Sequence, residues 1–320
     1  RCSRDWSSDV CSSDLAAARG FLAHFQLTRV NAIDVLPPHH VSGLMARVRC
    51  AVSGGEHRAW TWKRLEAGDR PELPPRGDGW VISLVPTQLQ RLVAAPGGAE
   101  WLRGFRIVFL GGGPVWPMLA EAAAAARVPV ALSYGMTETA AMVASQQPGD
   151  FAAGDRTCGR ALPHARVTVD AVGAVSVEGE SLFRGYWPGF RKEGEFPTDD
   201  SGTIDAQGRV AIAGRRDAVN ITGGKKVQPA RVEEVLRRAL GGADVAVSGA
   251  PDAEWGEAVV ACVPRGTRVP LPDHPLLAAL AAHERPKRWV SVDPWPVNAQ
   301  GKLNRIALRS AAASAAGAVT

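Results

Sequence analysis

Apolar residues along the first part of the chain recur at spacings that alternate between those of helices and those of strands. Residues 16–27 (AAARGFLAHFQL) predict an amphipathic helix, and residues 32–44 (AIDVLPPHHVSGL) predict a strand. Further apolar runs lie at residues 80–93 and 105–110. This alternation is typical of an α/β fold.

A glycine-rich turn follows the last of these runs. Residues 105–110 (FRIVFL) end at Gly111–Gly113, and Pro114 or Pro117 then opens an Ala-rich helix, because proline is tolerated in a first helical turn. Another apolar run comes directly afterwards, at residues 128–135 (VPVALSYG). Strand, glycine loop, helix and strand in this order form a βαβ unit, so we expect a buried parallel sheet.

The pattern changes after Asp150. Short strands with turn residues at 166–180 and 201–215 predict a small antiparallel unit with a hairpin loop at Asp205–Gly208. The next part combines helix, strand, strand and helix, expected at residues 229–240, 244–250, 257–263 and 276–283.

We therefore expect two domains. The large N-terminal domain is partial and covers residues 16–215, with the parallel sheet and the antiparallel unit. A small α+β domain covers residues 216–310, with the boundary near Gly214–Asp217, and residues 311–320 form a tail.

The first fifteen residues, RCSRDWSSDVCSSDL, differ from the rest of the chain. They are rich in Ser and Asp and have neither an initiating methionine nor the apolar core of a signal peptide. We interpret residues 1–15 as a translated junction that is not native, with native sequence missing upstream. Packing of Trp6 and Leu15 into the core would contradict this interpretation.

Composition limits the classes of partner. The chain of 320 residues has 37 basic and 32 acidic residues and no block of five like charges, which argues against a nucleic-acid arm. No apolar run approaches the roughly 18 to 20 residues needed to span a membrane. Five cysteines without CxxC spacing predict reduced thiols in a cytoplasmic protein.

The segment LSYGMTETAA, residues 132–141, ends a predicted buried strand, and ligands collect at that edge of a parallel sheet. Tyr134 has the shape to stack on a base, Thr137 to contact a phosphate and Glu138 to bind Mg²⁺. The alternative is that Thr137 and Glu138 only begin a helix, as an N-cap and a first-turn acid.

Other segments also have two interpretations each. Gly111–Gly113 permit a close approach to a ligand or only make a tight turn. Asp199 and Asp200 are partners for ribose hydroxyls or are solvated, and the Gly turn ITGGKKVQP contacts a phosphate or is an exposed hairpin. His40 and its neighbour His39 line a pocket or are structural.

Seven segments in order resemble the adenylate-forming superfamily of acyl-CoA synthetases, peptide-synthetase adenylation domains and luciferases. They are LPPHHVSGL, LVPTQLQRLV, IVFLGGGP, YGMTET, FPTDDSGTID, GRRDAVNITGGKKVQP and NAQGKLNR. The resemblance covers residues 33–308. It implies a large domain with a C-terminal lid, ATP, Mg²⁺ and coenzyme A as cofactor and substrates, and a carboxylate that is first adenylated and then transferred to a thiol.

The resemblance also implies roles for residues. Tyr134 would stack on adenine, with Gly135 beside it among the cofactor-binding positions, Thr137 would contact the phosphate and Glu138 would bind Mg²⁺. Asp200 and Arg215 would hold the ribose. Gly111, Gly112 and Gly113 would border the adenine and acyl pocket, and Gly223 and Gly224 would border the pantetheine channel. Asp217 matches the hinge of the lid, and Lys302 matches the lysine that the lid inserts for adenylation.

Two departures from the family pattern stand out. The Gly-rich Ser/Thr-and-Lys loop that cradles the β- and γ-phosphates is absent, and we expect it upstream of Ala16. Asp199 replaces the usual glycine before Asp200, which adds a negative charge near the nucleotide.

Within the superfamily the chain is most similar to the o-succinylbenzoate:CoA ligases of menaquinone synthesis, where His40 would stand between the acyl pocket and the α-phosphate. The expected function is an acid–thiol ligase that takes a small-molecule carboxylate, ATP and CoA, with no nucleic acid or membrane as partner and homo-oligomerisation left open. The alternatives are another acyl- or aryl-CoA synthetase, or a catalytically silent AMP-binding fragment that lacks the phosphate loop.

Overall fold

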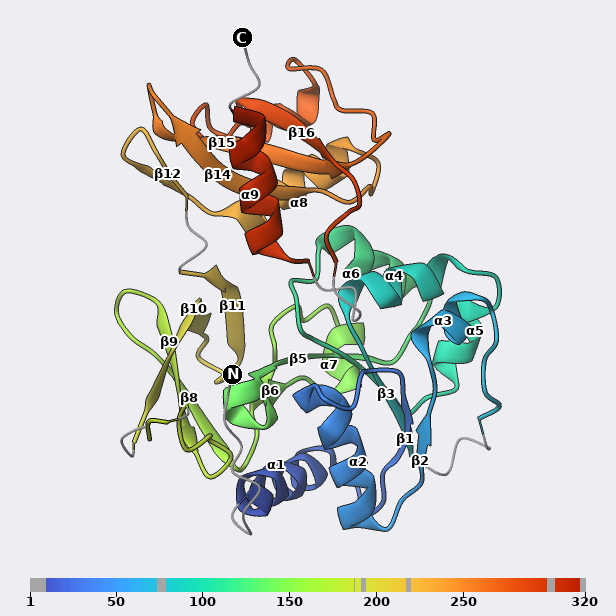
Figure 1. Ribbon diagram of the computed structural model, residues 1–320. Coiled ribbons are helices and arrows are strands. Elements are labelled where there is room, and N and C mark those ends of the chain that lie inside the picture. The colour runs from blue at the N-terminus through green and yellow to red at the C-terminus, as the bar shows by residue number, and fades with distance from the viewer. Residues whose placement is uncertain are drawn as a thin grey trace. The chain divides into compact units, whose positions relative to one another are not determined.

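The computed structural model describes residues 10–73, 79–186, 188–190, 194–216, 220–297 and 303–316. The chain divides into two compact units (Figure 1). Unit 1 comprises residues 1–115 and 119–213, and unit 2 comprises residues 116–118 and 214–320.

Unit 1 is built around a seven-stranded sheet in the order β2-β1-β3-β4-β5-β6-β7. Its strands are β1 (Asn31–Asp34), β2 (His57–Ala59), β3 (Trp80–Leu84), β4 (Ile107–Leu110), β5 (Val130–Met136), β6 (Ala141–Ser145) and β7 (Arg160–Ala161). Neighbours from β2 to β5 run parallel, whereas β6 and β7 each run antiparallel to the strand before. Strands β1 and β4 are buried at every position, so the predicted buried parallel sheet is confirmed.

Helices cover this sheet. They are α1 (Val10–Phe25), α2 (Val41–Ser53), α3 (Trp62–Glu66), α4 (Pro86–Ala94), α5 (Gly98–Arg103), α6 (Pro117–Ala125) and α7 (Pro148–Ala152). The rings of Phe21 and Phe25 on α1 lie 5.2 and 5.0 Å from the ring of Phe109 on β4. Such aromatic contacts, on residues buried in one cluster, fix α1 against the sheet.

A second sheet of unit 1 has the order β11-β10-β9-β8. Its strands are β8 (Ala165–Val169), β9 (Ala174–Gly179), β10 (Phe196–Ile204) and β11 (Val210–Arg215). β9 pairs antiparallel with both β8 and β10. The Gly208 N–H donates to the Asp205 carbonyl at 2.9 Å, which confirms the predicted hairpin loop between β10 and β11.

Unit 2 holds a five-stranded sheet with helices packed on it. Four strands follow the order β13-β12-β15-β14, and β16 pairs with β15. The elements are β12 (Asn220–Thr222), β13 (Lys225–Val227), α8 (Pro229–Ala239), β14 (Ala246–Asp252), β15 (Gly256–Pro264), β16 (Arg288–Val292) and α9 (Arg305–Ala316). Val232 and Leu236 of α8 are fully buried, as the helical periodicity predicts.

Three boundaries differ from those expected. The strand at residues 32–44 ends at Asp34, because Pro37 and Pro38 cannot pair within a sheet. The helix expected at 276–283 is a 3₁₀ turn at Pro275–Ala279. Helix α1 begins at Val10, inside residues 1–15, which we interpret as not native.

Within that segment Leu15 is half-buried, while Trp6 lies outside the described residues. The non-native origin of residues 1–15 stays a prediction.

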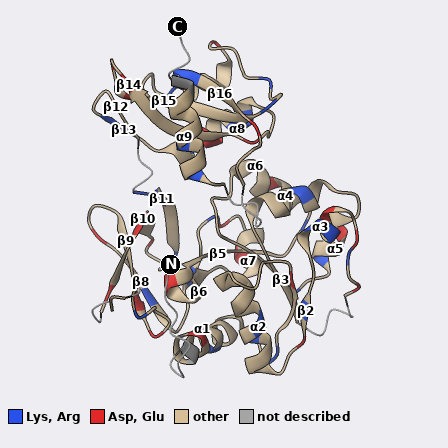
Figure 2. Cartoon of the chain, in the orientation of Figure 1, with Lys and Arg blue, Asp and Glu red and all other residues tan. Residues whose placement is uncertain are grey.

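Basic and acidic positions are interspersed in both units (Figure 2). Across the described residues, none of the helices has the length and hydropathy that crossing a membrane requires. Cys50, Cys158 and Cys262 are free, and burial raises the pKa of each thiol to about 11.

Candidate functional site

The parallel strands of unit 1 end at one edge, and the segments that follow them carry most of the expected site. Residues 35–40 follow β1, Pro86 follows β3, Gly111–Gly113 follow β4, and residues 137–140 follow β5. In open α/β sheets, ligands bind outside the carboxyl ends of the strands. The fold therefore gathers these motifs at the edge where a ligand is expected.

The side chains of Tyr134 on β5 and Asp200 on β10 are hydrogen-bonded to each other. The Tyr134 hydroxyl donates to Oδ2 of Asp200 at 2.7 Å, although the two residues are 66 positions apart. Burial raises the pKa of Tyr134, and the Asp200 carboxylate raises it further, so the hydroxyl stays protonated and donates. Asp200 is half-buried and Asp199 is exposed, which distinguishes the two neighbouring carboxylates.

The turn after β5 is tightly constrained. A Cβ on Gly135 would lie 1.8 Å from the Ala141 carbonyl oxygen, so the approach of β6 requires glycine there. Ala140 and Ala141 have φ of 50° and 76°, which is rare for residues other than glycine. Such conformations persist only where the surroundings hold them, and they cluster at functional sites.

Thr139, which the sequence interpretation did not select, holds this turn. Its hydroxyl accepts from the Met136 N–H at 3.0 Å and donates to the Ala141 carbonyl at 2.8 Å. Thr137 and Glu138 do begin a 3₁₀ turn, but its N-cap is Met136, so the N-cap interpretation of Thr137 is wrong. The Thr137 side chain is exposed.

Glu138 is held through both its backbone and its carboxylate. Its carbonyl accepts from the Phe183 N–H at 2.7 Å, and Oε1 accepts from the Tyr186 hydroxyl at 2.7 Å. Among the described residues no group of three or more His, Cys, Asp or Glu side chains forms a metal cage. A single carboxylate still suits Mg²⁺, which binds one or two carboxylates together with substrate phosphates.

The three glycines after β4 have separate surroundings. A Cβ on Gly111 would lie 2.7 Å from the Ser133 hydroxyl oxygen, so this position is closely packed against β5. Gly112 has φ of 77°, and both Gly112 and Gly113 are exposed. The tight turn is therefore present, and its outer two residues remain open to a ligand.

His40 stands at the N-cap position of α2, at the carboxyl edge of the sheet. It is half-buried, its ring lies 4.5 Å from that of His39, and its N–H donates to the Pro37 carbonyl at 3.0 Å. The loop that carries it is anchored by Asp34, whose Oδ1 accepts from the Leu36 N–H at 3.1 Å.

Asp34 is a second residue that the sequence interpretation missed. Oδ2 of Asp34 lies 3.1 Å from Nε2 of His57 on β2. Burial raises the pKa of the Asp34 carboxyl, and the hydrogen bond with His57 opposes the rise. The only signal in the sequence was an acid within the apolar run AIDVL, residues 32–36.

The remaining expected residues belong to unit 2 or lie outside the described residues. Arg215 is the last residue of β11 and falls in unit 2, while Asp217 and Lys302 are not among the described residues. Gly223 and Gly224 form the two-residue turn between β12 and β13, with φ of 54° and 76°. This geometry matches the exposed-hairpin interpretation, and contact with a ligand stays a prediction.

The described residues on either side of Lys302 pair with each other. Val297 and Leu303 form an antiparallel bridge, and the Asn304 N–H donates to the Pro296 carbonyl at 2.8 Å. Arg305 then donates through both terminal nitrogens to Glu233 of α8, at 2.9 and 3.0 Å.

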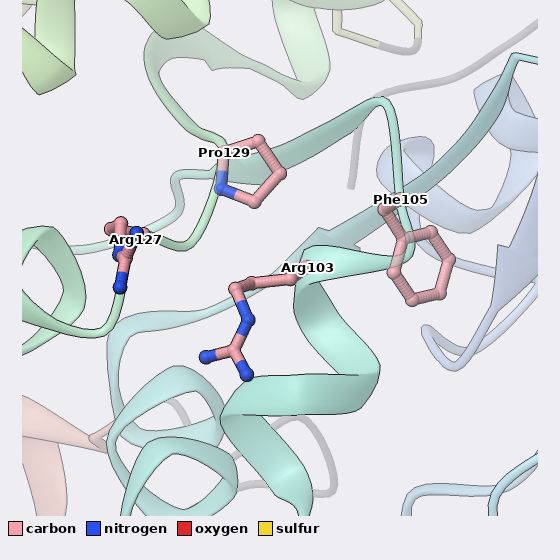
Figure 3. A pocket seen from close by; sticks show the side chains of 4 residues that line it. All are labelled: Arg103, Phe105, Arg127 and Pro129. Carbon is pink, nitrogen blue, oxygen red and sulfur yellow. The ribbon is translucent and has the colours of Figure 1, made fainter. Parts of the chain in front are cut away.

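A cavity of about 630 Å³ lies elsewhere, lined by Arg103, Phe105, Arg127 and Pro129 (Figure 3). These residues precede β4 and β5, so the cavity is at the edge opposite the motifs. Arg103 donates to the Ala126 carbonyl at 3.2 Å, near the end of α6. Arginines beside helix C-termini have a structural explanation in the helix dipole.

Comparisons with known proteins bear on this geometry. Residues 13–187 match the model of the family described as AMP-binding enzyme. A 2-succinylbenzoate–CoA ligase of Enterococcus faecalis is 31% identical over 307 residues, which cover 90% of this chain and 63% of the relative. An indoleacetate–CoA ligase of Aromatoleum aromaticum is 29% identical over 302 residues, which cover 85% and 58%.

Solved structures are also similar to this chain. The o-succinylbenzoate CoA synthetase (MenE) of Bacillus subtilis, in complex with the acyl-adenylate intermediate OSB-AMP, has a TM-score of 0.76 and 26% identity over 93% of this chain and 64% of that one. ATP-bound MatB of Rhodopseudomonas palustris has a TM-score of 0.75 and 28% identity over 93% and 63%. The chain thus spans less than two thirds of the length of these relatives.

Proposed function

Because the chain belongs to the family of AMP-binding enzymes, we propose that it is an acid–thiol ligase that activates a carboxylic acid with ATP. In the first half-reaction a carboxylate oxygen attacks the α-phosphorus, an acyl-adenylate forms and pyrophosphate leaves. In the second, the thiol of coenzyme A attacks the acyl carbon, the thioester forms, AMP leaves and the thiol proton is released. The proposal concerns the whole protein, because the relatives are longer than this chain.

The hydrogen bond between Tyr134 and Asp200 is the observation that carries the proposal. It places the hydroxyl oxygen of an aromatic side chain 2.7 Å from a carboxylate oxygen at the ligand edge of the sheet. An aromatic face suits a purine base, and the second oxygen of Asp200 suits the ribose hydroxyls. Glu138 follows Tyr134 by four residues, on the turn where the phosphates of the same nucleotide would lie.

Magnesium fits the carboxylate of Glu138. When bound, the ion would neutralise charge on the phosphates during adenylation. The chain's own contribution is to hold the backbone of Glu138 in place through the hydrogen bond from the Phe183 N–H to the Glu138 carbonyl.

Other residues take the roles that the family resemblance implies. We assign the phosphate contact to Thr137, the acyl-pocket junction to His40 and the adenylation cation to Lys302. A fixed cation stabilises the charge that develops on the phosphoryl oxygens. We assign Arg215 to the ribose together with Asp200, and Asp217 to the hinge. The rest are border positions, namely Gly111, Gly112, Gly113, Gly135, Gly223 and Gly224.

The acid that we propose is o-succinylbenzoate, and the product is its CoA thioester, an intermediate of menaquinone biosynthesis. The names of several relatives support this choice, because they are 2-succinylbenzoate–CoA ligases from different bacteria. We place the reaction in the cytoplasm, where ATP and coenzyme A are available.

Pyrophosphate release with a panel of acids tests the proposal. We expect release with o-succinylbenzoate to exceed release with indole-3-acetate and benzoate. Asp200→Asn is expected to weaken AMP binding by about tenfold, since a charge-assisted hydrogen bond is worth roughly 1.5–3 kcal/mol and Asp200 is half-buried. Asp199→Asn, one residue away and exposed, serves as the matched control.

Two results would contradict parts of this proposal. Faster release with indole-3-acetate would replace the substrate and keep the reaction. AMP binding without pyrophosphate release for any acid would favour the alternative of a chain that binds nucleotide and catalyses nothing.

A further inference from the structure

The hydroxyl of Tyr186 makes a contact that the proposed function does not require. It donates to Oε1 of Glu138 at 2.7 Å, across 48 positions of sequence. Tyr186 lies between β9 and β10 and is 49% exposed, so its ring contributes little to the core. A contact that is specific and also peripheral to the core calls for an explanation other than packing.

The segment that carries Tyr186 is anchored at two further points. The Phe183 N–H donates to the Glu138 carbonyl at 2.7 Å. The Phe183 ring packs against Tyr186 at 4.9 Å and against Phe196 at 5.1 Å. Phe196 opens β10, the strand that also carries Asp200, so one strand supports both carboxylates of the candidate site.

We infer that Tyr186 is a positioning residue, which holds the carboxylate of Glu138 ready to bind the magnesium ion that would accompany ATP. This inference rests on the proposed function and deepens it at the metal. A carboxylate has about four acceptor positions on two oxygens, so one bond to Oε1 leaves Oε2 available. Holding the side chain in one rotamer before the metal arrives reduces the entropy lost on binding.

A purely structural role makes a different prediction. An exposed hydrogen bond contributes about 1 kcal/mol or less to folding, so its loss would lower the unfolding free energy slightly and affect all ligands equally. A positioning role affects only the ligand that needs the metal. The two roles therefore separate when ATP is compared with AMP.

The test uses calorimetric titration of the full chain with ATP, with and without MgCl₂, and with AMP. The quantity of interest is the factor by which Mg²⁺ strengthens ATP binding. We expect Tyr186→Phe to reduce this factor about three- to tenfold, near the lower limit for residues that orient metal ligands. Affinity for AMP should stay unchanged, and the urea midpoint should fall only slightly, as the loss of one exposed hydrogen bond predicts.

Two control experiments test whether the effect is specific to the contact between Tyr186 and Glu138. Phe190→Leu removes another exposed aromatic side chain, four residues further along the sequence, and should leave the magnesium factor as in the wild type. In a Glu138→Gln background, adding Tyr186→Phe should have no further effect, because the two residues act as a unit.

The outcomes are distinct. An unchanged magnesium factor in Tyr186→Phe overturns the inference and leaves the proposed function intact, and so does an equal loss of ATP and AMP affinity. Absence of any magnesium effect in the wild-type chain overturns both.

Discussion

His164 is a buried side chain whose titration should be visible in the stability of unit 1. It is 8% exposed and lies against Gly20 of α1. Burial, and then the positive charge of Arg49, lower the pKa of His164 to about 4. The folded state therefore favours the neutral ring, whereas the unfolded chain takes up a proton near the ordinary value of 6.5.

We expect the unfolding free energy to be highest above pH 6.5 and to fall as the pH is lowered towards 4. The slope due to this residue is at most about 1.4 kcal/mol per pH unit. Urea unfolding at a series of pH values measures it, with His164→Leu as the variant that cannot titrate. His283→Leu, in unit 2, is the control and should keep the slope, while an unaltered slope in His164→Leu would contradict the assignment.

Single residues also show how far the sequence alone could lead. Tyr134, Glu138 and Asp200 stand in motifs, so their grouping could be predicted from the resemblance. Thr139 stands at the end of the YGMTET segment, but the motif assigned it no role, and its local hydrogen bonds appear only in the structure. Asp34 stands in none of the seven segments, and its role depends on His57, which the folded chain brings near. The sequence could not show that Tyr186 reaches Glu138, because that bond depends on how two distant turns meet.

At the scale of elements, the crossing from β5 to β6 depends on Gly135. Since a Cβ there would overlap the Ala141 carbonyl, we expect Gly135→Ala to lower the unfolding free energy by several kcal/mol. Gly149→Ala, on α7 with no atom within 4 Å of the added Cβ, should be neutral or slightly stabilising. Thermal unfolding compares the two, and equal midpoints would show that the strands can move apart.

The contact between α8 and the start of α9 depends on Glu233. This carboxylate is 4% exposed and accepts from both terminal nitrogens of Arg305 and from the Val247 N–H at 2.8 Å. We expect Glu233→Gln to destabilise unit 2 by about 2 kcal/mol, because a buried charge-assisted pair is broken.

The neighbouring Glu234→Gln is the matched control for this pair. Glu234 contacts Arg238 at 3.1 Å on the exposed side of the same helix, and such pairs are worth about 0.5 kcal/mol or less. Hydrogen exchange of unit 2 would report the difference. Similar effects of the two substitutions would mean that the buried pair is not a main stabilising contact.

Elements were easier to predict than their ends. The βαβ order, the hairpin at Asp205–Gly208 and helix α8 follow from periodicity and from glycine or proline positions. Residues 32–44 looked like one strand because apolar residues continue past Asp34. The chain turns there instead, since two prolines cannot donate to a sheet.

At the scale of the whole molecule, the two units have separate cores. The buried clusters around Phe109 and Val175 belong to unit 1, and those around Val259 and Val260 belong to unit 2. The texture of the sequence also changes near Gly214, where the main part of unit 2 begins. The sequence did not predict that helix α1 begins as early as Val10.

This division predicts a selective effect of nucleotide on stability. Tyr134, Glu138 and Asp200 all lie in unit 1, so AMP should raise the melting temperature of that unit's transition only. At a concentration 100 times the dissociation constant, the gain is about 2.7 kcal/mol. Scanning calorimetry resolves the two transitions, and an equal shift of both would contradict the assignment of the site to unit 1.

The free thiols of the described chain have a consequence for an enzyme that would release a thioester. Exposed thiolates exchange with thioesters, and such self-acylation would consume product and modify the protein. With the pKa of Cys50, Cys158 and Cys262 near 11, only about one thiol in ten thousand is ionised at neutral pH, and burial of Cys50 and Cys262 restricts access further. These three cysteines are therefore compatible with prolonged exposure to an acyl-CoA.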